Sequence, residues 1–579
     1  MERYDVVIVG GGLAGLTLAR HLLLTPGDRR ILLLEKRHAI PPGGQKVGEA
    51  TVQVSGYYLS KVLDLEEHLL REHFLKYNLR FYWKTGGDPA SIETYSQSYI
   101  RQFSNIATYQ LDRNKLEAEL LRLNMLDPRF TFVAGVQRID PAIRQSWHGV
   151  TFHAAGADTT VESRWLVDAS GRGKLLARPR GLHLPGAIRH GASFMWVEGL
   201  LNLEKLTNLS PTEALRHPNR ASIGHAPLWL ATNHFCGEGF WFWTIPLQGK
   251  TSLGLVFDNT LIPYDRVSSA RKLTDWVCAE LPLFARDLPG RRVLHHAGYR
   301  DFAFDCAQTI SVDRWALSGE AGRFSDPLYS PGGDLISLYN TLIVDAVLTE
   351  DDEELRRKTA LYEQMMRGFY EAYVPGFAVG YSTLGDQEAF SLKYTWELTI
   401  YFAFYVFPFL NGLFTDLRFA VHFLRRFTEL GRVNRSIQSF IAGYYRWKKE
   451  QGRIGQGGPV FFDFMDVGPL REAERTFYAI GLGADEAAGV LDRQLGNVLQ
   501  LARFIAAYVS SQVLGDAAVR SNRAYLDGLD LAALSFDAEE MRVRYARASA
   551  CSAEQYAWPF DPGVLDRFGG AQAPHSQVV

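Results

Sequence analysis

A glycine-rich turn near the start of the chain is the feature that most constrains its fold. An apolar β-type run at residues 6–9 leads directly into Gly10-Gly11-Gly12-Leu13-Ala14-Gly15, and a helical stretch follows over residues 16–24. Gly10 allows the tight turn, Gly12 opens the backbone to a pyrophosphate, and Gly15 lets the helix pack closely on the strand. Free N–H groups at the helix start favour phosphate. The pattern predicts a bound dinucleotide, against the alternative of an ordinary glycine turn.

The residues that follow complete the same unit. A second apolar run at residues 31–34 ends at Glu35. An acidic residue at this place can accept hydrogen bonds from ribose hydroxyls. The chain therefore begins with a Rossmann-type α/β domain.

Composition narrows the functional classes. The chain has 579 residues, enough for two or three domains. Its net charge of −2 gives no overall attraction to nucleic acid. Cys236, Cys278, Cys306 and Cys551 lie far apart, which argues against a metal site or a disulfide framework and fits a cytoplasmic setting. We expect no leader segment before the first strand.

One apolar segment raises the question of a membrane. Residues 398–410 read LTIYFAFYVFPFL. The run is shorter than the about 20 residues that a transmembrane helix needs, so we expect no membrane span. A buried helix is the favoured interpretation. Interfacial membrane contact and the lining of an apolar substrate site are the alternatives.

The order of patterns divides the chain into parts. Residues 74–81 alternate between apolar and polar side chains, which predicts a half-buried strand with Lys76 on its polar face. Short aromatic β-type runs between residues 190 and 258 predict an inserted sheet. The Rossmann-type domain resumes with a strand at residues 315–318, and a helix follows over residues 334–348. We predict a first dinucleotide-domain part at residues 1–189, a mostly antiparallel β-sheet substrate domain at 190–295, a second dinucleotide-domain part at 296–348 and a C-terminal helical substrate-access region at 349–579.

Three signatures then carry a resemblance. The glycine turn, residues 168–171 (DASG) and residues 319–322 (GEAG) stand in the order found in flavoproteins with two dinucleotide-binding domains. The last is similar to the GDA motif of that group, with Glu320 in place of Asp. This resemblance implies FAD as the cofactor rather than NAD.

Within that group, the chain resembles the flavin-dependent halogenases. Residues 48–51 look like the GEAT loop of that family, and residues 241–246 (WFWTIP) match its WxWxIP motif. Lys76 stands where the family has its essential lysine, because Arg80 and Phe81 follow at a similar spacing. The resemblance implies that Trp241, Trp243, Pro246 and Tyr329 wall the flavin or the substrate pocket. It also implies FAD contacts by Gly10, Gly12, Leu13, Ala14, Gly15, Glu35, Lys36, Gly48, Glu49, Ala50, Arg113, Asp168, Gly319, Glu320, Gly332 and Gly333.

The chemistry that the resemblance implies centres on Lys76. Reduced FAD, used as FADH2, and oxygen convert halide into hypohalous acid, which travels through a tunnel to a separate substrate site. Lys76 would hold this oxidant beside an electron-rich carbon. A cation polarises the oxygen–halogen bond, and burial makes a lysine easier to deprotonate. The alternative is that Lys76 is merely the polar face of a strand.

Two departures from the family pattern affect the prediction. Tyr329 stands where tryptophan-specific members have a glutamate, which argues against free tryptophan and favours a phenol, a pyrrole or another indole. The family binds chloride or bromide on a turn that here reads Ser330-Pro331-Gly332. Proline has no N–H, so Ser330 and Gly332 are the predicted halide residues with one donor missing.

We therefore keep three hypotheses open. The first is a halogenase that acts on an electron-rich aromatic, free or carrier-bound. The second is a non-halogenating FAD-dependent monooxygenase or reductase, and the third is an FAD-binding protein without turnover. A second glycine fingerprint for NAD(P)H is not apparent, so a separate NAD(P)H-dependent flavin reductase is the expected partner. A homodimer is compatible with the sequence.

Overall fold

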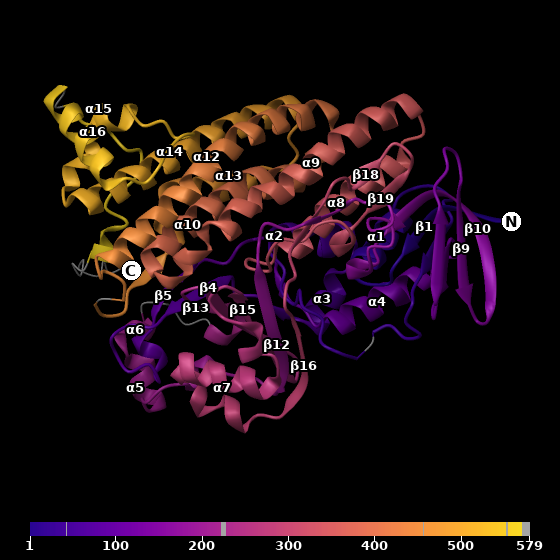
Figure 1. Cartoon of the computed structure of the whole chain (residues 1–579), viewed down its shortest axis with the longest axis horizontal. Coiled ribbons are helices and arrows are strands. Elements are labelled where there is room, and N and C mark those ends of the chain that lie inside the picture. The colour runs from indigo at the N-terminus through magenta and orange to yellow at the C-terminus, as the bar shows by residue number, and fades with distance from the viewer. Residues whose placement is uncertain (42, 222–226, 456, 552–553, 570–579) are drawn as a thin grey trace.

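The computed structural model describes residues 1–41, 43–221, 227–455, 457–551 and 554–569. Three parts are visible in Figure 1. The dinucleotide domain around β1 and β10 lies at the right, a second sheet with α7 lies at the bottom, and a layer of long helices covers both. None of the described helices has both the length and the apolar character required to cross a membrane.

The first sheet confirms the Rossmann-type prediction. Its order is β18-β19-β10-β1-β2-β7; the pairs from β19 to β7 are parallel, and β18 is antiparallel to β19. Helices α1 and α4 pack together on it, and α8 packs against α1. Residues 6–9 of β1 and all of β2 are apolar and buried, as expected for a parallel sheet covered by helices. The bounds are β1 Glu2–Val9, α1 Leu13–Leu24, β2 Ile31–Leu34, α4 Arg113–Met125, β7 Phe130–Val133, β10 Ala157–Asp168, β18 Ile310–Ser311, β19 Trp315–Leu317 and α8 Pro331–Leu348.

The second sheet is wider than the predicted insertion. Residues 190–258 do form a run of antiparallel strands, but β4, β5 and β20 extend the same sheet from outside residues 190–295. The sheet therefore extends beyond the predicted segment, because a sheet edge can pair with strands from distant parts of the chain. The bounds are β4 Leu79–Trp83, β5 Ser96–Tyr99, β12 His190–Glu198, β13 Thr232–Gly237, β14 Phe240–Leu247, β15 Lys250–Asp258, α7 Ala270–Glu280, β16 Val293–Tyr299 and β20 Phe461–Asp463.

The segment around Lys76 also differs from the prediction. It is not one half-buried strand: β3 (Phe74–Leu75) ends before Lys76, and β4 begins only at Leu79. Asn78 has a φ of 59°, a left-handed conformation that interrupts the strand. Lys76 is 3% exposed and does not lie on a solvent face. The polar residues of the alternating pattern are partly internal, since the Arg80 guanidinium is buried over the ring of Tyr99.

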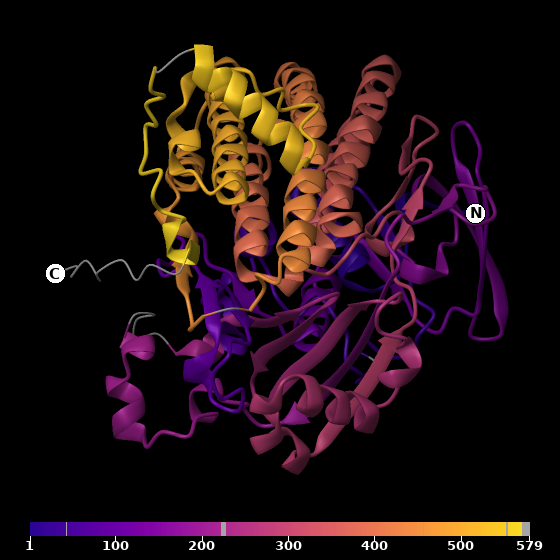
Figure 2. The same cartoon turned by 60° about the vertical axis from the view of Figure 1, so that its left-hand side comes forward.

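The C-terminal part is helical, as predicted, within the described residues. Helices α9, α10, α12 and α14 run side by side above the second sheet in Figure 2. The apolar segment 398–410 is buried inside this layer, which confirms the buried-helix interpretation. Asp351, Asp386 and Asp416 cap the starts of α9, α10 and α12. The bounds are α9 Asp352–Ala378, α10 Gln387–Tyr401, α11 Phe407–Leu410, α12 Leu417–Glu450, α13 Gly468–Phe477, α14 Ala484–Leu514, α15 Arg523–Asp527 and α16 Ala538–Cys551.

Candidate functional site: two cavities on either side of a thin wall

The glycine turn after β1 has the geometry of a phosphate-binding loop. Gly10 has a φ of 112°, and a Cβ added there would lie 2.3 Å from the carbonyl oxygen of Ala169. A Cβ on Gly15 would lie 2.0 Å from the carbonyl oxygen of Gly10. A Cβ on Gly12, by contrast, would meet nothing within 4 Å. The turn therefore leaves open space in front of the start of α1, where the N–H groups favour an anion.

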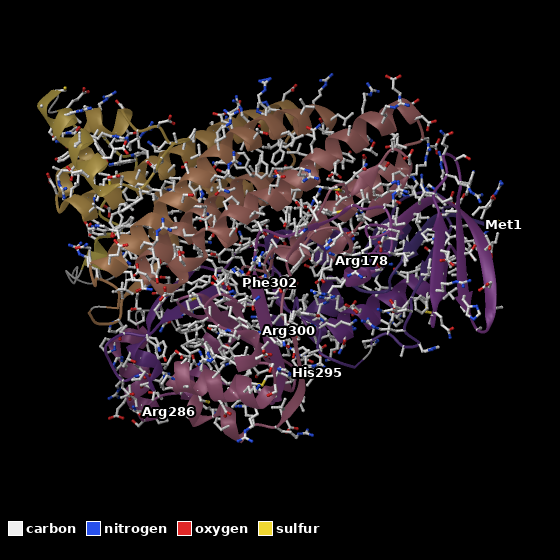
Figure 3. All side chains as sticks on the ribbon, in the orientation of Figure 1. Met1, Arg178, Arg286, His295, Arg300 and Phe302 are labelled. Carbon is white, nitrogen blue, oxygen red and sulfur yellow. The ribbon has the colours of Figure 1, made fainter. Side chains whose placement is uncertain are left out.

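A large cavity extends from this turn between the dinucleotide domain and the second sheet. Phe302, labelled in Figure 3, lies near the centre of the molecule and lines this cavity. The wall contains many residues predicted to bind or enclose the cofactor: Leu13, Gly48, Glu49, Ala50, Arg113, Trp241, Trp243, Gly319, Glu320, Ser330, Gly332 and Gly333. We call it the flavin cavity.

Polar groups of the flavin cavity fit a dinucleotide. Arg113 lines it, and the guanidinium Nε is buried without a hydrogen-bond partner among the described residues. The other guanidinium nitrogens donate to the carbonyl of Val47 at 2.8 Å and to Glu117 at 2.5 Å. Burial raises the pKa of the Glu320 carboxyl, which also lines the cavity. Arg113 and Glu320 therefore bring charged groups to the wall of the cavity, as the polar parts of a dinucleotide require.

Glu35 lies where the sequence predicts an acceptor for ribose. Its carboxylate accepts the Gly11 amide at 2.6 Å and the Arg37 amide at 2.9 Å, so it is fixed at the mouth of the glycine turn. Its neighbour Lys36 is exposed and does not line the flavin cavity. A contact between Lys36 and the cofactor stays a prediction without support from this geometry.

Asp168 holds the backbone of the turn after β10. It is fully buried, and its carboxylate oxygens accept hydrogen bonds from the backbone amides of Ser170 at 2.9 Å and Leu176 at 2.8 Å. It does not line the flavin cavity, and neither does Pro246, which lies in β14. Contacts of these two residues with the cofactor or the pocket stay predictions.

Glu49 connects the GEAT loop to the tryptophan motif. Its carboxylate accepts hydrogen bonds from Trp196 Nε1 at 2.6 Å and from Ser252 Oγ at 2.5 Å. Trp243 Nε1 in turn donates to Ser252 Oγ at 3.0 Å. Burial raises the Glu49 pKa to about 7, although these hydrogen bonds oppose the rise. The network fixes the indole of Trp243 against the flavin cavity.

Lys76 lines a second cavity, which we call the lysine cavity. Its wall comes from the residues next to Lys76, from the start of α8 and from the helical layer. The lining of the lysine cavity includes Lys76, Tyr329, Pro331, Asp334, Tyr373, Tyr394, Glu397, Leu398, Tyr401 and Phe402.

The two cavities lie on opposite sides of the same two chain segments. In the first segment Thr51 and Ser55 face the flavin cavity, whereas Val52 and Gln53 face the lysine cavity. In the second segment Ser330, Gly332 and Gly333 line the flavin cavity, whereas Tyr329, Pro331 and Asp334 line the lysine cavity. The Ser55 amide donates to Asp334 Oδ1 at 2.8 Å and ties the segments together. The wall is therefore only one chain segment thick.

Lys76 is placed at this wall with an altered acidity. The Nζ donates to the carbonyl of Thr51 at 2.5 Å. Burial lowers the Lys76 pKa from 10.5 to about 7, although the nearby Asp334 carboxylate opposes the drop. Burial raises the Asp334 pKa to about 6, although hydrogen bonds from Tyr401 and Ser55 oppose the rise. The amine is thus poised between its neutral and charged forms at neutral pH.

The predicted halide turn offers fewer donors than its family pattern. Tyr329 and Ser330 have positive φ angles of 69° and 62°, so the turn is held in a left-handed conformation. The Ser330 amide donates to the carbonyl of Pro327 at 2.9 Å and is not free. Pro331 has no N–H and occupies the first position of α8. Gly332 and Gly333 supply the remaining amides of that first turn.

The sequence interpretation missed several polar residues of the helical layer. Lys393 on α10 is 1% exposed, and its Nζ contacts both Glu397 oxygens at 2.7 and 2.6 Å and the Tyr329 hydroxyl at 3.1 Å. Burial lowers the Lys393 pKa. A lysine and a glutamate four residues apart next to the apolar segment 398–410 were the available signal, since charges are rarely buried without a function or a partner.

Comparisons with known proteins agree with this architecture. The tryptophan halogenase family model matches residues 5–125. LodB of Marinomonas mediterranea, named as an FAD-dependent oxidoreductase, is 32% identical over 64% of this chain and 91% of its own length. The flavin-dependent halogenase chlA of Dictyostelium discoideum is 24% identical over 63% of this chain and 64% of its own length.

The chain belongs to a family of FAD-dependent oxidoreductases that includes LodB, and residues 5–125 match the tryptophan halogenase family model. FAD is therefore its cofactor. The solved structure of halogenase PltM in complex with phloroglucinol and FAD covers 86% of this chain with a TM-score of 0.59 at 17% identity, and supports the same fold. The present chain covers 64% of the length of chlA, just under two thirds.

Proposed function

We propose that this protein uses reduced FAD, oxygen and halide to halogenate an electron-rich aromatic ring held beside Lys76. The single observation that carries the proposal is the thin wall between the flavin cavity and the lysine cavity. An oxidant made on one side needs to pass only one chain segment to reach the lysine. Reduced FAD, when bound, supplies the two electrons that activate oxygen.

The overall reaction balances without another oxidant. The aromatic C–H, FADH2, oxygen and halide give the aryl halide, FAD, water and hydroxide. Lys76 binds the hypohalous acid through its amine, whose position is set by the Thr51 carbonyl. Asp334, in the same cavity, is available to accept the proton that leaves the ring carbon, because its pKa of about 6 leaves it mostly ionised at neutral pH.

The substrate class that fits is a phenol or a pyrrole rather than free tryptophan. Tyr329 is buried, and its hydroxyl is engaged with Lys393, so it acts as a wall of the lysine cavity. Phenols and pyrroles stabilise the ring cation themselves and need less help from a base. Relatives carry the names tetracycline 7-halogenase and 1H-pyrrole-2-carbonyl-[peptidyl-carrier protein] chlorinase, which supports an electron-rich ring.

The reduced flavin would come from a separate NAD(P)H-dependent flavin reductase. The sequence has one glycine fingerprint, and that fingerprint belongs to the flavin cavity. We infer from this single fingerprint that the electrons arrive from the separate reductase.

A halide-independent FAD monooxygenase is the second candidate. Pro331 and the occupied Ser330 amide remove donors from the predicted halide turn. LodB, at 32% identity, is named as an oxidoreductase and not as a halogenase. These two observations favour the monooxygenase, which would use the same flavin cavity.

One experiment separates the two candidates. Anaerobically reduced, FAD-loaded protein is mixed with oxygen and phloroglucinol, with and without bromide, and products are identified by mass spectrometry. We expect bromophloroglucinol only with bromide, and none from Lys76→Ala. Hydroxylated product at a rate that ignores bromide would replace the halogenase by the monooxygenase.

A further inference from the structure

A groove in the helical layer lies next to the lysine cavity. It runs between α9, α10 and α12 and is lined in its interior by apolar side chains such as Ile400, Leu424 and Phe427. Figure 1 shows these helices in the layer above the second sheet. None of the residues assigned to the cofactor lines this groove.

The groove and the lysine cavity share three side chains. Tyr373, Glu397 and Tyr401 line both. The Tyr401 hydroxyl donates to Asp334 Oδ2 at 2.7 Å, so the shared boundary contacts the same carboxylate that lies near Lys76. The groove and the lysine cavity are therefore neighbours, separated by these three side chains.

The inner carboxylate of the groove is already neutralised. Glu397 pairs with Lys393 at 2.6 Å and accepts a hydrogen bond from Gln438 at 2.9 Å. Gly376 makes room for it, since a Cβ there would lie 2.1 Å from Glu397 Oε1. Glu397 therefore adds little negative potential for a ligand to overcome.

The outer part of the groove carries uncompensated positive charge. Arg432 and Arg435 on α12 line it and are exposed, and neither makes an ion pair or a side-chain hydrogen bond among the described residues. The third arginine of the lining, Arg367, is already used: it donates to backbone carbonyls and lies 3.6 Å from the carboxylate of Glu371, the remaining acid of the lining. Arg432 and Arg435 are the two cations left for a ligand.

We propose that the groove binds the anionic end of the substrate, a carboxylate or a phosphate, while the reactive ring occupies the lysine cavity. This inference rests on the proposed function, and it defines the substrate as an electron-rich ring joined by an apolar spacer to an anion. A guanidinium matches both carboxylate and phosphate through paired hydrogen bonds. The apolar interior of the groove accommodates the spacer.

Binding without turnover tests this inference. Oxidised, FAD-loaded full-length protein is titrated calorimetrically with ω-(4-hydroxyphenyl)alkanoic acids of increasing chain length and with their methyl esters, in the absence of reductant and halide. We expect at least one acid to bind about tenfold more tightly than its ester, a preference that falls as salt is raised. Titration with the same compounds carrying a terminal phosphate in place of the carboxylate shows which of the two anions the groove binds more tightly.

Matched variants locate the effect. The double variant Arg432→Gln/Arg435→Gln is expected to bind acid and ester equally. Arg446→Gln is the control, because Arg446 is exposed on the same helix, roughly 16 Å further along at about 1.5 Å per residue, and does not line the groove. Equal binding of acid and ester by the unmodified protein, binding of neither, or a preference that survives the double variant overturns the inference. Because halide is absent, none of these results depends on whether the enzyme halogenates.

Discussion

Lys76 is expected to cost the fold stability at neutral pH. Burial lowers its pKa from 10.5 to about 7 in the folded protein, whereas the unfolded chain retains the ordinary value. As pH falls from 10.5 towards 7, the unfolded chain binds a proton that the folded chain does not, so the free energy of unfolding decreases. The drop, at about 1.36 kcal/mol per pH unit, corresponds to about 5 kcal/mol.

Lys76→Met removes this penalty at similar side-chain length. The variant also loses the hydrogen bond to the Thr51 carbonyl, and leaving that buried acceptor unpaired costs about 1–3 kcal/mol. We therefore expect Lys76→Met to be more stable than the parent by about 2–4 kcal/mol at pH 7. The advantage should shrink as pH rises and reverse between about pH 8 and pH 10, where the remaining penalty falls below the cost of the lost hydrogen bond. Above pH 10.5 the lysine is neutral in both states, and only the lost hydrogen bond remains.

Urea unfolding of the two proteins at several values between pH 7 and pH 10 measures the difference. Other titrating groups are common to both proteins and largely cancel. Lys36→Met is the control, because Lys36 is exposed and makes no ion pair among the described residues, and its effect should stay within about 0.5 kcal/mol. A Lys76→Met protein that is less stable than the parent at pH 7, or a difference independent of pH, would refute the assigned burial of the amine.

Three further predictions concern activity and cofactor binding. Lys76→Ala should retain FAD binding, measured by flavin fluorescence, and lose the halogenated product; full product formation would contradict the role of Lys76. Gly15→Ala should lose both stability and FAD, because its Cβ meets the Gly10 carbonyl at 2.0 Å, whereas Gly12→Ala should keep its unfolding midpoint and weaken only FAD binding, since its Cβ meets nothing within 4 Å. Pro331→Thr should restore an N–H at the start of α8 and lower the bromide KM about tenfold, the effect of one hydrogen bond to an anion of about 1.5 kcal/mol or more; an unchanged KM would place the halide elsewhere.

Short-range patterns explain why much of the fold was predictable. The strand, glycine turn and helix at the N-terminus obey local backbone rules: Gly10 needs a positive φ and Gly15 needs to be without a Cβ wherever this unit occurs. The helix 334–348 and the burial of residues 398–410 also follow from local composition. The family motifs, which are short stretches of sequence, pointed to Lys76 as the candidate reactive residue.

The environment of those residues depended on contacts between distant segments. The alternating pattern placed Lys76 on a polar strand face. In the structure, the left-handed Asn78 and the hydrogen bond from the Lys76 amide to the Thr108 carbonyl direct the lysine side chain towards a buried cavity. Glu397 lines the same cavity from a helix more than three hundred residues away, and Lys393 on that helix contacts Tyr329 of the lining. By itself the sequence determined the dinucleotide fold, because that fold follows from local backbone rules, and the resemblance to the halogenases pointed to Lys76. Only the tertiary structure decided the acidity of Lys76, the thin wall and the groove beside it, because desolvation and charge pairing are set by whichever segments pack together.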